Sequence, residues 1–202
     1  MILKRTNSLW ILAFSLWAIA VMGGFWTVLN YEKTPGITLH APTQWPTQAP
    51  VALAPTGATL VLFVHPKCPC TKATLSELAI LMTHCHERLT TYLFFLSPSH
   101  FSEDWSKDSL WKQAQEIPGV QLFQDKDGET ARHFHATTSG QCFLYGQNGK
   151  LFFEGGITDS RGHSGDNPGR SAITSIVLQG HSDIEKTPVF GCELFHPSLA
   201  KT

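Results

Sequence analysis

Two cysteines separated by a single residue occur in the segment His65-Pro66-Lys67-Cys68-Pro69-Cys70. Pro69 suits the first position of a helix, where no backbone N–H is needed, and this makes Cys68 the N-cap residue. A sulfur at an N-cap faces unpaired N–H groups and the positive end of the helix dipole, and Lys67 adds a positive charge beside it. Because each influence lowers the pKa of a thiol, the motif predicts a reactive thiolate suited to thiol–disulfide exchange.

The one-residue spacing limits the disulfide that these two sulfurs could form. Residues two apart in a helix point about 200° apart, so a Cys68–Cys70 bond requires Cys68 to stay outside the helix. Their Cα separation of about 5.5–7 Å lies at the edge of what a disulfide accepts, so we expect a strained and easily exchanged bond. Cys68 is the expected nucleophile and Cys70 the expected resolving thiol. A structural disulfide or a pair of inert thiols is the weaker alternative.

The other three cysteines leave several alternatives open. Five cysteines cannot all pair within one chain. Cys142 begins an expected strand and is either a further redox partner or a core cysteine. Cys192 lies in a tail without periodicity that could fold over the site, where it would pair with Cys142 or act as a third redox thiol. Cys85 stands between two histidines that point to different helix faces, and we expect it to be structural or on the surface.

Several polar residues are candidate contributors to the site. His65, three residues before Cys68, could carry protons near neutral pH or simply end a strand. The segment 160–170 is rich in Gly, Asp, Asn, His and Arg, which indicates an active-site rim or an anion site with His163 and Arg170 as participants. A solvated loop in which Asp166 or Asn167 caps the next helix is the alternative.

The elements that must position these residues follow from the apolar pattern. Continuous apolar segments predict two strands buried on both faces, and the apolar spacing between them predicts a helix, which together form a right-handed βαβ unit. Asn148-Gly149 between apolar segments predicts a hairpin. The expected elements are strands at 59–64, 91–96, 120–123, 142–145 and 151–154, and helices at 69–88, 102–116, 129–135 and 168–179. Together they predict an α/β domain with a central mixed sheet flanked by helices.

This order of elements, with the cysteine turn and the segment 140–156, resembles the thioredoxin superfamily. The insertion in which residues 125–129 lead into a short helix is similar to the membrane-tethered TlpA/ResA and peroxiredoxin branch. The cysteine motif together with residues 160–170 resembles bacterial RedB-like proteins. The resemblance covers roughly residues 45–195. It implies a thioredoxin-like fold with a βα insertion, anchored on the far side of a membrane, and it implies no particular substrate.

Two features qualify what the resemblance implies. The superfamily usually has a cis-proline just before the hairpin, and here that position is Gln141 or its neighbour Gly140. Copper chaperones of the same fold hold Cu(I) with two thiolates and a histidine, and soft thiolates suit that ion. The alternative function is therefore copper delivery, with Cys68 and Cys70 as ligands and His65, His163 or Cys192 as a third.

The N-terminal part predicts a membrane anchor. Residues 9–29 carry no charge and as a helix would span about 32 Å, enough to cross a bilayer. Lys4 and Arg5 precede them, which favours a cytoplasmic N-terminus at residues 1–8 and a domain in the periplasm, held by the inner membrane. A cleaved signal peptide is the competing interpretation, although its apolar region would usually be shorter.

The remaining expectations concern domain limits and partners. We expect a proline-rich tether at residues 30–57, the thioredoxin-like domain at 58–180 and a tail at 181–202 that packs on the domain. Charged residues are 15% of the chain and the formal net charge is -1, with no basic stripe, which argues against a nucleic-acid partner. The expected partners are thiols or disulfides of exported proteins, and the exchange chemistry requires no cofactor.

Overall fold

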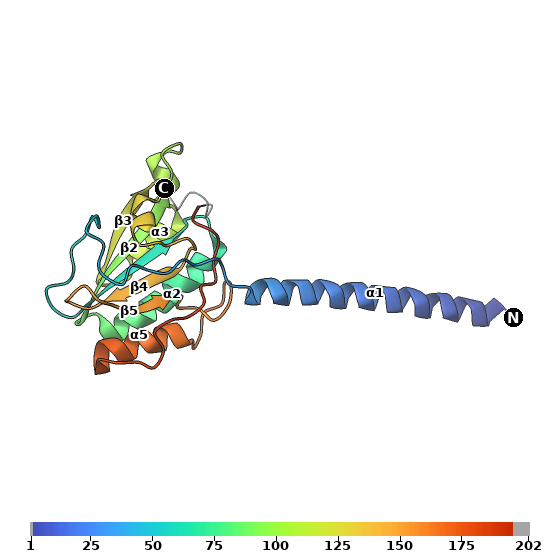
Figure 1. Ribbon diagram of the computed structural model, residues 1–202. Coiled ribbons are helices and arrows are strands. Elements are labelled where there is room, and N and C mark those ends of the chain that lie inside the picture. Colours follow the sequence, from blue (N-terminus) through green and yellow to red (C-terminus); the bar gives the residue numbers. More distant parts are fainter. Residues whose placement is uncertain (1, 196–202) are drawn as a thin grey trace. The chain divides into compact units, whose positions relative to one another are not determined.

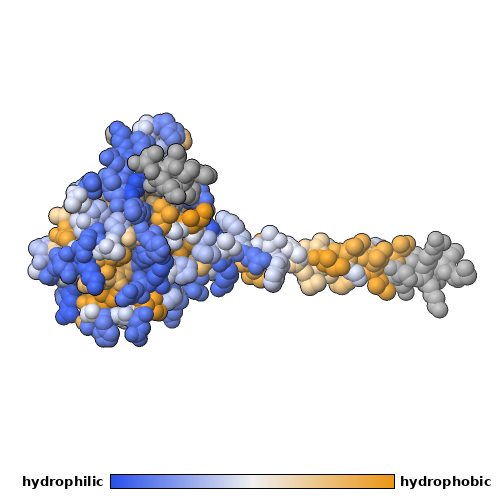
Figure 2. Space-filling model, viewed as in Figure 1, coloured by the Kyte–Doolittle hydropathy of each residue, from blue (hydrophilic) through white to orange (hydrophobic). Residues whose placement is uncertain are grey.

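The computed structural model describes residues 2–195, which form two compact units that divide between Thr34 and Pro35. The first unit consists of one helix, α1 (Ile2–Lys33). Its segment Leu9–Lys33 is long and strongly apolar, and Figure 2 shows apolar side chains along much of the face in view. By length and composition, α1 can therefore cross a membrane.

The second unit is built on a five-stranded sheet with the order β3-β2-β1-β4-β5 (Figure 1). The strands are β1 (Ala58–Val64), β2 (Leu89–Ser97), β3 (Val120–Lys126), β4 (Gln141–Tyr145) and β5 (Leu151–Gly155). β1, β2 and β3 are parallel, whereas β4 is antiparallel to both β1 and β5. β1 is buried at all seven positions, as its continuous apolar sequence predicts.

Helices α2 (Pro69–Cys85), α3 (Ser109–Gln115) and α5 (Pro168–Gln179) cover one face of the sheet. Figure 1 shows α2 beside α5 beneath the strands. The predicted helix at 102–116 is instead divided into a 3-10 turn, η1 (Glu103–Trp105), and α3. The division falls at Asp108, whose carboxylate accepts the N–H of Leu110 at 3.0 Å and so caps a new helix.

The other face of the sheet is covered partly by the segment that the sequence analysis expected to be a tether. From Pro35 onward this segment belongs to the compact domain. The ring of Trp45 packs against Phe134 and Tyr145, each with a centroid distance of 5.2 Å, and the hydroxyl of Tyr145 donates to the carbonyl of Pro42 at 2.9 Å. The reason is that the sheet is apolar on both faces, so the face opposite α2 also requires cover. The short helix α4 (Glu129–His133) supplies the rest.

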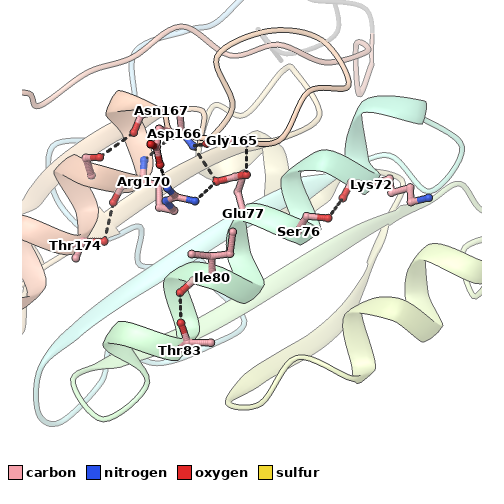
Figure 3. A network of polar contacts seen from close by, with 11 residues as sticks. Lys72, Ser76, Glu77, Ile80, Thr83, Gly165, Asp166, Asn167, Arg170 and Thr174 are labelled. Atoms are coloured by element: carbon pink, nitrogen blue, oxygen red, sulfur yellow. Dashed lines mark hydrogen bonds and ion pairs between the residues drawn. The ribbon is translucent and has the colours of Figure 1, made fainter.

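A buried ion pair connects α2 to the start of α5 (Figure 3). The side chain of Glu77 on α2 is fully buried, and its carboxylate lies 2.6 Å from Nη1 of Arg170. It also accepts the backbone N–H of Gly165 at 2.7 Å and the amide of Asn167 at 3.0 Å. Asn167 in turn caps α5 by accepting the N–H of Arg170 at 2.8 Å. Arg170, predicted to contribute to an active-site rim or an anion site, is paired with the carboxylates of Glu77 and Asp166. The cap at Asn167 agrees with the alternative prediction for this segment.

We expect Glu77→Gln to lower the free energy of unfolding by about 3 kcal/mol, because the substitution leaves the largely buried guanidinium of Arg170 without its counter-charge. The measurement is urea unfolding of the full chain in detergent. Asp166→Asn is the matched control, since Asp166 also pairs with Arg170 but is fully exposed. We expect that variant to keep the wild-type midpoint. Equal destabilisation by the two variants would contradict the account.

Candidate active site

Cys68 stands at the N-terminus of α2, in the turn that follows β1. Its φ of -84° and ψ of 120° are extended, and Pro69 occupies the first helical position. The N–H of Cys68 donates to the carbonyl of His65 at 3.1 Å, and the carbonyl of Cys68 accepts the N–H of Thr71 at 3.0 Å. The prediction that Cys68 is an N-cap residue is therefore confirmed, and its sulfur is fixed at the end of the helix where backbone N–H groups are unpaired.

The loop of residues 137–140, just before β4, holds this turn in place. The hydroxyl of Ser139 accepts the N–H of His65 at 2.9 Å and lies 3.1 Å from the hydroxyl of Thr71. Gln141 was predicted as an auxiliary site residue, but its side-chain oxygen accepts the backbone N–H groups of Thr137 and Thr138, at 3.0 and 3.4 Å. Gln141 therefore shapes the loop. No cis peptide occurs among residues 2–195.

The C-terminal tail lies along this same loop. The N–H of Ser139 donates to the carbonyl of Cys192 at 2.8 Å, and Thr138 forms an antiparallel bridge with Glu193. In this position the N–H of Cys192 donates to the sulfur of Cys68 at 3.3 Å. The structure therefore brings Cys192 to Cys68 rather than to Cys142. Residues 196–202 of the predicted tail lie outside the described part of the chain.

The three thiols around this point have strongly divergent pKa values. Hydrogen bonding from the thiol of Cys70, followed by the thiol and N–H of Cys192 and the N–H of Cys70, lowers the pKa of Cys68 to about 4. These contacts outweigh the burial of Cys68, which raises its pKa. The hydrogen bond to Cys68, together with burial, raises the pKa of Cys70, and burial and Cys68 raise that of Cys192 to about 12. At neutral pH, Cys68 is the thiolate and the other two are hydrogen-bond donors.

The positively charged side chains near the cysteines are Lys67, which was predicted to lower the pKa of Cys68, and Arg161, which was not predicted. The ammonium of Lys67 pairs with the carboxylate of Asp108 at 3.0 Å and lies 5.7 Å from the ring centroid of Trp105. Its charge is therefore balanced by Asp108. Arg161, which the sequence analysis did not single out, lies close enough to favour the thiolate forms of both Cys70 and Cys192. The only sequence signal for Arg161 was its position in the polar segment 160–170.

Burial is the main cause of a lowered pKa at His65, and the neighbouring thiolate of Cys68 opposes it. Its ring meets Trp105 edge-on at a centroid distance of 5.6 Å, and its Nδ1 accepts the N–H of Lys67 at 3.1 Å. His65 is therefore a neutral neighbour of Cys68, with its Nδ1 engaged within the turn.

The exposed His163 places its Nδ1 2.9 Å from the carbonyl oxygen of Arg161.

The remaining two cysteines are enclosed in the core. Cys142 is fully buried among the apolar side chains between the sheet and its helices, and this burial raises its pKa. The structure thus agrees with the core alternative for Cys142. Cys85 lies in the same cluster, at the end of α2. Among the described residues, no group of three or more His, Cys, Asp or Glu side chains is arranged to hold a metal ion.

In the sheet, β1 lies between the parallel strand β2 and the antiparallel strand β4, and the cysteine turn follows β1. Along the chain, the β4–β5 hairpin and α5 come last. The fold is thioredoxin-like. β3 and α4 are the extra strand and helix that the resemblance to the TlpA/ResA branch implies between β2 and the hairpin. The prediction of a mixed α/β fold with a βα insertion, preceded by one apolar helix, is confirmed.

Solved structures share this fold. An uncharacterised conserved protein from Geobacillus kaustophilus matches 81% of this chain and 93% of its own, with 19% identity and a TM-score of 0.57. A hypothetical protein from Sinorhizobium meliloti 1021 matches 80% of this chain and 97% of its own, with 19% identity and a TM-score of 0.60. At these identities the likeness concerns the fold alone. No protein-family model and no curated protein matches the sequence.

We expect the thiolate of Cys68 to become protonated as the pH falls through about 4. Removing the thiol donor in Cys70→Ala should raise that midpoint, because a hydrogen bond to the charged form is lost. Cys70→Ser, which keeps a hydroxyl donor, should raise it less. The measurement is thiolate ultraviolet absorbance against pH, corrected with Cys68→Ser and accompanied by circular dichroism. An unchanged midpoint in Cys70→Ala would show that Cys70 does not stabilise the thiolate.

Proposed function

We propose that this chain is a membrane-anchored thiol–disulfide oxidoreductase in which Cys68 is the attacking group. One observation carries the proposal: Cys68 is the N-cap residue of α2, and its sulfur accepts the N–H of Cys192 at 3.3 Å. The lowered pKa of Cys68, about 4, agrees with this position. A thiolate, not a thiol, attacks a disulfide. The arrangement therefore keeps Cys68 in its nucleophilic form throughout the neutral range.

The reaction follows from the charges of the three thiols. The Cys68 thiolate attacks one sulfur of a client disulfide, a mixed disulfide forms, and the other client sulfur departs as a thiolate that takes up a proton. A second protein thiol then attacks the Cys68 sulfur and releases the client as a dithiol. Because Cys68 has a low pKa, it is also a good leaving group in the reverse direction. The same site therefore supports oxidation or reduction, according to the redox partner.

Aromatic side chains beside the cysteine turn support a polypeptide client. Trp105 contacts the ring of His65 and stacks on Phe101 with a centroid distance of 4.7 Å and an interplanar angle of 6°. Phe101 is 47% exposed, which is high for a large apolar side chain. This pair offers an exposed apolar surface within reach of the site, of the kind that binds side chains of an extended chain.

We place the domain in the periplasm, held by α1 in the inner membrane with its N-terminus in the cytoplasm. The length of the apolar segment and the preceding Lys4 and Arg5 support this orientation. An oxidising compartment also suits a site whose work is disulfide exchange. The expected clients are thiols or disulfides of exported proteins.

Full-length protein in detergent should catalyse the reduction of insulin disulfides by dithiothreitol. Cys68→Ser should lower this activity to the uncatalysed rate, because serine offers no thiolate. Cys85→Ala is the matched control, since Cys85 is a buried cysteine of the same helix outside the site, and it should retain activity. The proposal fails if Cys68→Ser remains as active as Cys85→Ala. Tight one-to-one copper binding that depends on Cys68, without reductase activity, would favour copper delivery instead.

The proposed topology has a separate test in cells. A reporter enzyme that is active only in the periplasm should be active when fused after the C-terminus and inactive when fused before α1. Replacing Lys4 and Arg5 with glutamate should weaken this bias, because the positive charges that retain the N-terminus are lost. Activity of the N-terminal fusion alone would show that the N-terminus lies in the periplasm and would contradict the proposed orientation.

A further inference from the structure

The C-terminal tail makes a set of contacts with the site that the two-cysteine chemistry does not require. Two backbone hydrogen bonds fasten it to the loop before β4: the N–H of Ser139 to the carbonyl of Cys192, and the N–H of Leu194 to the carbonyl of Thr137, each at 2.8 Å. The bridge between Thr138 and Glu193 lies between them. The tail is thus an extended chain, paired with the loop as a short antiparallel ladder, with its cysteine at Cys68.

The residue before Cys192 permits this close approach. A Cβ atom on Gly191 would lie 1.9 Å from the carbonyl oxygen of Ser139, so a side chain at this position would force the tail away from the loop. The carbonyl of Gly191 accepts a hydrogen bond from the guanidinium of Arg161 at 2.5 Å. A glycine without room for a side chain and a charge-assisted hydrogen bond therefore fix the residue next to Cys192.

We infer that Cys192 is the resolving thiol, and that the oxidised form of the protein carries a Cys68–Cys192 disulfide that binds the tail to the start of α2. This inference rests on the proposed function, because it requires Cys68 to form mixed disulfides with clients. It assigns Cys70 a different task, that of donating a hydrogen bond to the Cys68 thiolate.

The geometry of the two candidate resolving thiols favours Cys192. Cys70 is the second residue of α2, only two positions from Cys68, so a bond between them would be strained. Cys192 belongs to a non-helical segment whose backbone N–H already contacts the Cys68 sulfur, and a loop of this length imposes no such constraint. The Cys68–Cys192 bond is therefore the less strained product.

The charge of Cys68 determines when Cys192 becomes a nucleophile. Burial is the largest cause that raises the pKa of Cys192 to about 12, and while Cys68 is a thiolate its hydrogen bond and its negative charge add to this effect. A mixed disulfide at Cys68 carries no charge, so these two influences disappear while Arg161 still favours the Cys192 thiolate. Cys192 then loses its proton to solvent, attacks the Cys68 sulfur and displaces the client sulfur as a thiolate. The client disulfide gains two electrons, and Cys68 and Cys192 together lose two.

Disulfide mapping tests this inference on the full-length chain in detergent. Reduced protein is treated with glutathione disulfide, free thiols are alkylated, and trypsin then releases Cys68 and Cys70 on the peptide 68–72 and Cys192 on the peptide 187–201. Wild-type protein and Cys70→Ser should both yield a cross-link between these peptides. In Cys192→Ser, glutathione should remain on Cys68, with release slower by on the order of a hundredfold.

Cys85→Ala serves as the control and should give the wild-type cross-link. The Cys70→Ser result is independent of Cys192→Ser and leaves the tail contacts intact, so a folding defect in one variant does not decide the test. A bond confined to the peptide 68–72, with Cys192 alkylated and Cys192→Ser resolving as fast as wild type, would overturn the inference and leave the proposed function standing. A Cys68 that is recovered as a free, alkylated thiol in every variant, with neither glutathione nor a protein disulfide on it, would overturn both.

Discussion

The position of one sulfur atom before the first turn of α2 is the constraint on which the rest of the site depends. Pro69 starts the helix and leaves Cys68 outside it, as the N-cap residue. Cys68 has only 1% of its surface exposed, and burial alone would raise the pKa of its thiol. The pKa of Cys68 is low because hydrogen bonding from Cys70 and Cys192 outweighs desolvation.

Contacts from distant parts of the chain position the Cys68 thiolate. The loop before β4 is held on one side by the carbonyl of Ile37, which accepts the hydroxyls of Thr137 and Thr138, and on the other by the tail. That loop carries Ser139, which holds the backbone of His65 at the start of the cysteine turn. The segment before β1, the hairpin and the tail thus jointly define where the thiolate lies. Of these segments, the tail contacts the sulfur itself, through the N–H of Cys192.

The sequence predicted the parts of the fold that depend on local pattern. Continuous apolar strands, the Asn148-Gly149 hairpin and the cap at Cys68 each carry their signal within a few residues. The cap at Asn167 agrees with one of the alternatives for residues 160–170. The tether was a wrong expectation, because isolated residues such as Trp45 give no periodicity, although a sheet that is apolar on both faces does require a second cover. The ion pair of Arg170 was not predicted because its partner Glu77 is 93 positions away and is a buried carboxylate on α2.

The sequence identified the central cysteines of the candidate site but could not choose among the alternatives for Cys192. Cys68 and Cys70 are marked by their spacing, whereas Cys192 is brought to them by backbone hydrogen bonds, which leave no pattern of side chains. Ser139, Thr71 and Arg161 likewise act through contacts between segments far apart in sequence. Local chemistry thus identifies the nucleophile, and only tertiary structure identifies the groups that stabilise it.

The most direct test of the account is the reduction potential of the disulfide that Cys68 forms in the full-length protein. It is measured by equilibration with glutathione buffers, and the oxidised fraction is quantified by alkylation and mass spectrometry. A stabilised thiolate favours the reduced form, so we expect reversible exchange with a potential above about -300 mV, more oxidising than that of structural disulfides. A Cys68 that does not exchange, or that exchanges only below about -300 mV, would contradict the claim that its sulfur is a redox-active thiolate.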